Sequence, residues 1–142
     1  MPFSSTDFRV RVAFENPVGR LLEHSDGYLV VQYYAGKRKL QDLQVFLTTA
    51  SDTLHRRGWY KLLGDQREMM AFTEEERIWI TTNWLKNAAS NAQPFYGAVL
   101  LSHDVFARLS MNLVMSESRE SSLIYRIFED ESVAATWLKQ LP

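Results

Sequence analysis

One short run constrains the fold more than any other stretch of this 142-residue chain. Residues 96–101 read Tyr-Gly-Ala-Val-Leu-Leu, with no charge and no polar alternation. Such a run is typical of a strand buried on both faces of a sheet. Ser102 or Asp104 can then cap a helix, because a short side-chain oxygen accepts hydrogen bonds from the first free backbone N–H groups. The stretch therefore predicts a strand-cap-helix unit of an α/β sheet.

Strands are predicted on both sides of this unit. Alternating apolar residues predict a half-exposed strand at 8–14, and a weaker extended piece follows at 18–24. An Asp26-Gly27 turn leads into a strand at 28–34, and a further core strand is predicted at 59–63. The last strand, at 123–127, is expected to turn Leu123, Tyr125 and Ile127 inward and Arg126 outward.

Four helices are predicted from apolar residues that recur at spacings of three and four. The expected inner face of the first helix is Leu40, Leu43, Leu47, Ala50 and Leu54, and Gly58 ends this helix. The second inner face is Ile80, Trp84 and Ala88, after a Thr73–Glu76 capping box. The third is Val105, Phe106, Leu109 and Leu113, and the fourth is Ala134, Trp137, Leu138 and Leu141, after acidic residues 129–131. Polar residues at 87–94 and 116–122 predict loops.

The element order is therefore β-β-β-α-β-α-β-α-β-α. It predicts a single α/β domain over 1–142, with N-terminal strands at 1–25 and a core at 26–141. The expected architecture is one mixed sheet of five to six strands. An antiparallel meander comes first, and three β-α-β steps with parallel neighbours follow.

Composition limits the function classes. The net charge of −1 gives no overall basic field for nucleic acid, and the absence of cysteine excludes disulfides, thiol catalysis and thiolate metal sites. We find no signal peptide and no apolar run near the ~20 residues that a membrane span needs. We therefore expect a cytoplasmic protein that neither inserts into membranes nor binds nucleic acid.

The element order and residues 125–138, Tyr-Arg-Ile-Phe-Glu-Asp-Glu-Ser-Val-Ala-Ala-Thr-Trp-Leu, resemble the close of the STAS-like domains. These include the bacterial anti-sigma-factor antagonists and small relatives of lipid-carrier-like fold, and the resemblance covers roughly 26–141. Phospho-switch members of that family carry an Asp-x-Ser motif after the second core strand. Here Asp65 matches the acid, but Gln66 and Arg67 follow. The resemblance therefore implies a non-enzymatic regulatory or ligand-holding module without the phospho-acceptor serine.

A ligand site is expected where strands end and helices begin, because these turns share one edge of an open α/β sheet. The candidate residues there are Lys37, Arg38, Asp65, Arg67, Ser102 and His103. Cations just before a helix oppose its positive end, and a bound anion at Lys37 and Arg38 would offset that cost. A solvated loop ahead of the helix is the simpler explanation and the favoured one. Tyr34 and Phe72 are candidates for an apolar slot beside them.

No catalytic, metal or cofactor site is predicted. Ser102, His103 and Asp104 are adjacent in sequence, so their side chains do not converge as a triad, and capping explains two of them. Glu74, Glu75 and Glu76 point about 100° apart on a helix and suit a capped start better than a metal ion.

An open sheet face is the second candidate surface. Outward strand positions include Arg9, Arg11, Lys61 and Arg126, with Tyr28 and Tyr34 near them, and this mixture of arginine and tyrosine is common in protein interfaces. We therefore expect a non-enzymatic regulatory or protein-interaction module, with an unknown protein partner or a homodimer. The alternative is a binding, sensing or carrier domain for a small anionic or amphipathic, lipid-like ligand.

Overall fold

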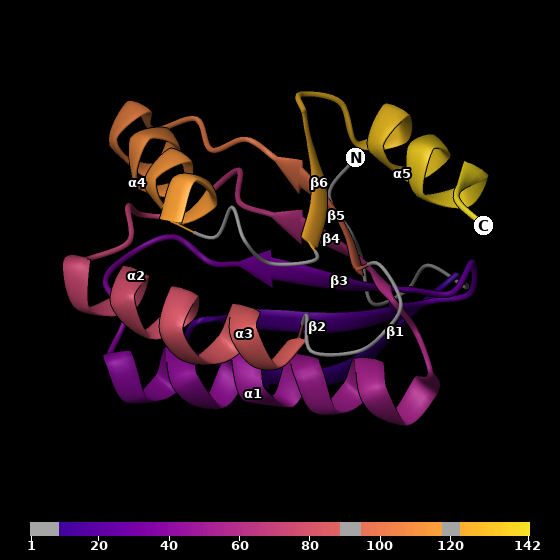
Figure 1. The fold of residues 1–142 in the computed structure, drawn as a ribbon, viewed down its shortest axis with the longest axis horizontal. Helices are drawn as coiled ribbons and strands as arrows, with labels where there is room; N and C mark the ends of the chain where they lie inside the picture. The colour runs from indigo at the N-terminus through magenta and orange to yellow at the C-terminus, as the bar shows by residue number, and fades with distance from the viewer. Residues whose placement is uncertain (1–8, 89–94, 118–122) are drawn as a thin grey trace.

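A computed structural model describes residues 9–88, 95–117 and 123–142 of the chain. It contains one six-stranded mixed sheet and helices packed on it, which confirms the predicted fold class (Figure 1). The predicted loops at 87–94 and 116–122 lie mostly outside the described residues. The strands are β1 (Val10–Asn16), β2 (Gly19–His24), β3 (Tyr28–Tyr33), β4 (Lys61–Asp65), β5 (Phe95–Leu100) and β6 (Leu123–Phe128).

The six strands lie in the sheet in the order in which they occur in the sequence. β1, β2 and β3 pair antiparallel, and β3, β4, β5 and β6 pair parallel, as predicted. The helices are α1 (Leu40–Arg57), α2 (Glu74–Trp79), α3 (Leu85–Ala88), α4 (Val105–Glu117) and α5 (Glu131–Gln140), and a π-helical segment η1 (Ile80–Trp84) joins α2 to α3.

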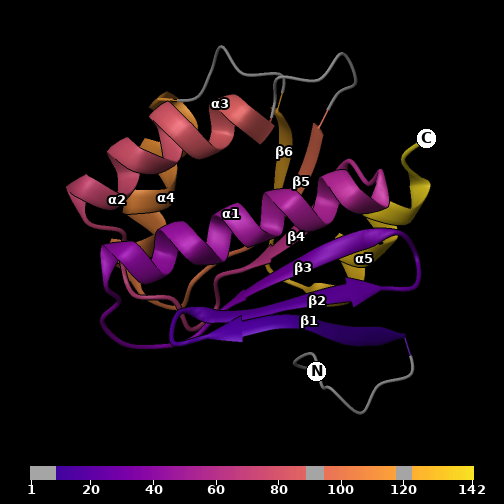
Figure 2. The same cartoon turned by 90° about the horizontal axis from the view of Figure 1, so that it is seen from below.

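Helices cover the sheet unequally on its two faces. The larger apolar core holds side chains of α1, η1, α3 and α4 together with inward residues of the sheet. The smaller core lies on the opposite face, where α5 supplies Ala134 and Leu138. Figure 2 shows α1 beside the strands, with α2 and α3 next to it. The three parallel crossovers therefore place their helices on one face, and α5 returns on the other.

Three helix boundaries follow the predicted signals. Gly58 ends α1 with a φ of 66°, a left-handed conformation that glycine adopts readily. Thr73 starts α2 with a capping box, in which its side chain accepts from the Glu76 N–H and the Glu76 carboxylate accepts from the Thr73 N–H. The Asp130 carboxylate accepts from the Ser132 and Val133 N–H groups at the start of α5.

The predicted inner face of α4 is wrong. Val105, Phe106, Leu109 and Leu113 are exposed, and the buried residues are Ala107, Ser110, Met111, Val114 and Met115. The helix carries apolar residues on two opposite sides, so periodicity allowed either side to face the sheet. The buried side includes the small residues Ala107 and Ser110, which let the helix approach the sheet closely.

The predicted inner side of β6 faces the larger core but is less buried than expected. Tyr125 and Ile127 were expected in the core, yet they are 41% and 40% exposed, and Ile124 is 47% exposed. β6 lies at the edge of the sheet, where it has a strand neighbour, β5, on one side within the described part of the chain. Its apolar residues therefore reach solvent on both faces.

Candidate functional site

The turns that follow the parallel strands meet at the carboxyl ends of these strands, as expected. The Gln66 N–H donates to the Leu100 carbonyl at 3.1 Å, and the His103 N–H donates to the Arg67 carbonyl at 3.1 Å. The ends of β4 and β5 are therefore joined directly by the backbone.

A polar hollow of about 390 Å³ lies at these strand ends, and Asp65, Arg67 and His103 are among its lining residues. Arg20, Gln32 and Asp65 occupy matching positions on β2, β3 and β4. Arg20 donates to Gln32 Oε1 through Nε at 3.0 Å and Nη2 at 2.8 Å, and Gln32 Nε2 donates to Asp65 Oδ2 at 3.3 Å. A polar row thus crosses three strands.

Arg67 pairs with two carboxylates, Asp65 of this row and Glu131 of α5. Its Nε and Nη2 each lie 2.9 Å from an Asp65 oxygen, and Nη2 lies 3.0 Å from Glu131 Oε1. Burial by itself raises the pKa of the Asp65 carboxyl, but the hydrogen bonds and charge of Arg67 outweigh burial and lower it. Arg67 therefore ties β4 to the start of α5, and a free anion would have to displace both carboxylates.

Arg38 also has its charge neutralised inside the protein. Its Nε and Nη2 donate to Glu76 at 3.0 and 2.8 Å, and the two side chains are each 3% exposed. Nη1 and Nη2 donate further to the Met70 and Ala71 carbonyls. The structure thus gives Arg38 a role in joining the start of α1 to the start of α2, in place of the predicted anion contact.

The remaining predicted ligand residues do not form one group. Lys37 is exposed and does not line the polar hollow. Ser102 is buried, and its hydroxyl donates to the Met69 carbonyl at 3.1 Å and accepts from the Asp104 N–H at 3.1 Å. His103 is exposed at the hollow. Of the six, the structure brings Asp65, Arg67 and His103 together.

The predicted interface residues lie in three different environments. Arg11 is on β1, where its exposed side chain lies 3.0 Å from Glu23, and Arg9 precedes that strand. Arg126 is on β6, at the opposite edge of the sheet, with its guanidinium over the Phe128 ring. Tyr28 is 1% exposed and stacks on His24, so it does not contribute to an exposed face as predicted.

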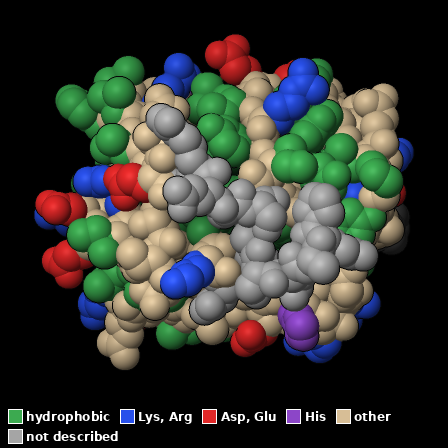
Figure 3. All heavy atoms as spheres, viewed as in Figure 1, with side chains coloured by type: hydrophobic (Ala, Val, Ile, Leu, Met, Phe, Trp, Pro, Cys, Tyr) green, Lys and Arg blue, Asp and Glu red, His purple; other side chains and the backbone are tan. Residues whose placement is uncertain are grey.

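An apolar surface on α4 and β6 is the feature that sequence reasoning missed. Seven of the twelve large apolar side chains that are exposed in the described structure belong to it: Val105, Phe106, Leu109, Leu113, Ile124, Tyr125 and Ile127. Figure 3 shows hydrophobic side chains at the surface over α4, at the upper left. The two elements adjoin, because Met111, Val114 and Met115 of α4 line one cavity with Leu123 and Tyr125 of β6. Ile124 alternates with these two strand residues, so it reaches solvent on the opposite face of the β6 edge.

The sequence did show a second apolar side of α4, but periodicity alone could not tell which of the two sides faces solvent. We name these seven residues the α4–β6 surface. Within the described ranges, no three His, Asp or Glu side chains lie together in a way that could hold a metal ion.

Comparisons with protein-family models, with curated proteins and with solved structures gave no match for this chain. The resemblance to STAS-like domains therefore stays a prediction. No helix in the described part of the chain is long and apolar enough to cross a membrane.

Replacing Arg38 by Met tests its assigned structural role. Arg38→Met keeps the apolar stem but leaves Glu76 buried without its cation, so we expect a loss of about 3–5 kcal/mol in unfolding free energy. Urea unfolding measures it. Lys37→Ala, at the exposed neighbouring position, is the matched control and should change stability by less than ~0.5 kcal/mol. Equal stability of the two variants would contradict the role.

Proposed function

We propose that this chain is a non-enzymatic interaction module that associates with a second copy of itself through the α4–β6 surface. The observation that carries the proposal is the exposed apolar edge formed by β6 beside the apolar outer side of α4. A symmetric dimer suits such an edge, because a strand can pair antiparallel with its own copy around a two-fold axis.

The two edges of the sheet differ in ways that favour β6. β1 carries exposed Arg11 and Glu15, and its register shifts between Val12 and Phe14. Charges and irregular register are the usual means by which an edge strand avoids pairing. β6 pairs with β5 without a register shift, and Arg126 is the one charged residue among its six. An exposed apolar edge with so little protection is typical of a strand that pairs.

The exposure of the α4–β6 surface also points to a partner. Its seven residues are 40% to 69% exposed. Exposed apolar patches on soluble proteins usually mark interaction sites. Association would remove these side chains from water, which favours a partner.

Charge and side-chain direction select one register for the paired β6 strands. With a two-fold axis perpendicular to the sheet, residues that lie opposite each other on the two strands must point to the same face. This is possible only when one residue lies directly opposite its own copy at the axis. An axis at Arg126 would place two guanidinium groups opposite each other, which is unfavourable. An axis at Tyr125 places the two tyrosines opposite each other and each Ile124 opposite the partner's Arg126. Tyr125 and Arg126 are the two middle positions of β6, where an axis pairs the most residues, so we centre the dimer on Tyr125.

Cysteine cross-linking tests this register, because the chain has no cysteine of its own. In the Tyr125→Cys variant the two Cα atoms would lie about 5 Å apart across the axis, within disulfide range, so air oxidation should give a covalent dimer. The matched control is Ile127→Cys, on the same face of β6 with nearly the same exposure. Its Cα atoms would be about 14 Å apart, beyond disulfide range.

The two cysteine variants separate the outcomes on a non-reducing gel. A dimer from Tyr125→Cys and none from Ile127→Cys supports the proposal. Equal cross-linking at both positions contradicts the register. No cross-linking, together with a monomer mass by sedimentation of the unmodified chain, contradicts self-association and leaves the surface to a different protein.

The contribution of α4 is tested separately with Phe106→Ser. Phe106 is 69% exposed, so the change should leave the unfolding free energy of the monomer within ~0.5 kcal/mol. Loss of a buried aromatic contact in each copy should weaken dimerisation at least tenfold by sedimentation equilibrium. The control is Val45→Ala on α1, an exposed apolar residue outside the α4–β6 surface. Unchanged dimerisation of Phe106→Ser would remove α4 from the interface.

A further inference from the structure

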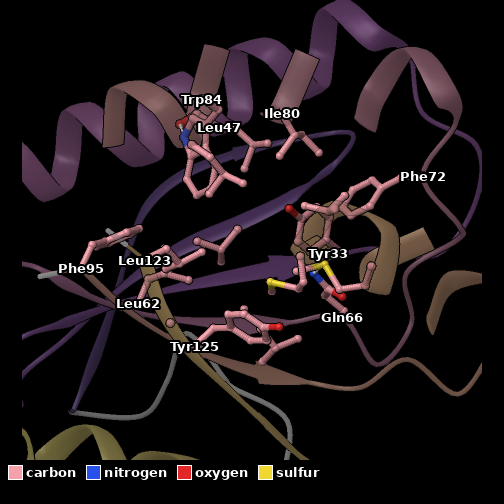
Figure 4. Close-up of a pocket in the computed structure, with 18 residues that line it drawn as sticks. Tyr33, Leu47, Leu62, Gln66, Phe72, Ile80, Trp84, Phe95, Leu123 and Tyr125 are labelled. Carbon is pink, nitrogen blue, oxygen red and sulfur yellow. Dashed lines mark hydrogen bonds between the residues drawn. The ribbon is translucent and has the colours of Figure 1, made fainter. Parts of the chain in front are cut away.

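An apolar cavity lies between the sheet and the helices of the larger core. Its enclosed volume is about 60 Å³. Figure 4 shows Trp84, Leu47 and Ile80 on one side and Tyr125 on the other, with Phe95, Leu62 and Leu123 at the left end. The wall is therefore almost entirely hydrocarbon.

Two glycines of neighbouring parallel strands leave this space open. Gly64 of β4 and Gly97 of β5 both line the cavity. Neither has a positive φ. A Cβ would meet its nearest neighbour at 3.9 Å on Gly64 and 3.6 Å on Gly97, which is ordinary contact. Backbone conformation and close packing therefore do not require glycine here, although glycine weakens a strand interior. The two missing side chains account for room beside the strands.

Polar groups without partners lie at one end of the cavity. Tyr33 and Gln66 both line it and are 6% and 4% exposed. Gln66 Nε2 donates to the Met111 sulfur at 3.1 Å, whereas Gln66 Oε1 and the Tyr33 hydroxyl make no hydrogen bond with any described residue. Burial raises the pKa of Tyr33, so this hydroxyl stays protonated and can donate. Figure 4 shows both residues at the right, opposite the hydrocarbon end.

We propose that this cavity binds a small neutral aliphatic molecule carrying one hydroxyl group. The hydroxyl would accept from Tyr33 and donate to Gln66 Oε1, and the hydrocarbon part would lie over Gly64 and Gly97. A neutral ligand fits, because none of the described residues that line the cavity carries a charge. The enclosed volume is under half of the ~150 Å³ that accommodates benzene in a dry protein cavity, so the ligand has only a few carbon atoms.

The cavity wall can adjust around such a ligand. Met111 and Met115 of α4 line it, and their unbranched side chains have several rotamers at little cost. The π-helical segment η1 contributes Ile80 and Trp84, and π-helical turns occur often at functional sites. The cavity shares Tyr125 with the proposed dimer, which otherwise uses the outer side of α4 and the edge of β6.

Methyl NMR of the methionine side chains tests the inference with isobutanol and xenon as probes. Titration of the whole protein should shift the methyl signals of Met111 and Met115 in a saturable manner. Exposed Met70 is the internal control. A shift without saturation, or an equal shift at Met70, would overturn the proposal.

Two variants establish where and how the probes bind. Gly64→Ala with Gly97→Ala fills the cavity, so it should weaken both probes at least fivefold while raising Tm by about 2–5 °C. Tyr33→Phe removes the free hydroxyl, so it should weaken isobutanol at least threefold and leave xenon unchanged. Val45→Ala, on the exposed side of α1, should alter neither. Undiminished binding in the alanine pair would overturn the site, and undiminished isobutanol binding in Tyr33→Phe would overturn the hydroxyl contact.

Discussion

The parallel pairing of β3 to β6 is the constraint on which the rest of the structure depends. A crossover between parallel neighbours is right-handed, so three successive crossovers in one direction across the sheet place α1, α2–α3 and α4 on the same face. α4 and β6 come last in this series. Both therefore lie at the end of the fold, and each keeps an apolar side that no described element covers.

The conspicuous charges of the chain mostly stabilise the fold. Arg38 and Glu76 neutralise each other between α1 and α2, and Arg67 joins Asp65 to Glu131 between β4 and α5. Such pairs satisfy buried charge and fix the relative positions of elements, but they leave little attraction for a free anion. The structure thus favours apolar recognition at two places, the α4–β6 surface and the glycine-lined cavity. Tyr125 borders both.

The sequence was sufficient for the fold and insufficient for the site. Alternation, the Thr73 capping box and the Gly58 stop are local signals, and local hydrogen bonds decide those boundaries. The meeting of the turns at the carboxyl ends of the parallel strands followed from the topology of the sheet. The side of α4 that packs on the sheet could not be predicted, because both sides are apolar and the choice depends on which side chains fit against the strands. The pairing of Arg38 with Glu76 spans 38 residues, and no local pattern reveals it. Gly64 and Gly97 are visible in the sequence, but their diagonal placement on one face, two positions apart in register, requires the strand pairing.

The central claim is that β6 pairs with a second copy of itself. Backbone amide hydrogen exchange of residues 123–128, measured at low and high protein concentration, tests it most directly. Pairing predicts that alternate β6 amides exchange more slowly at high concentration, while exchange in β1 stays the same, because only the β6 edge gains hydrogen-bond partners. Exchange in β6 that does not depend on concentration, over a range that spans micromolar to millimolar protein, would contradict the claim.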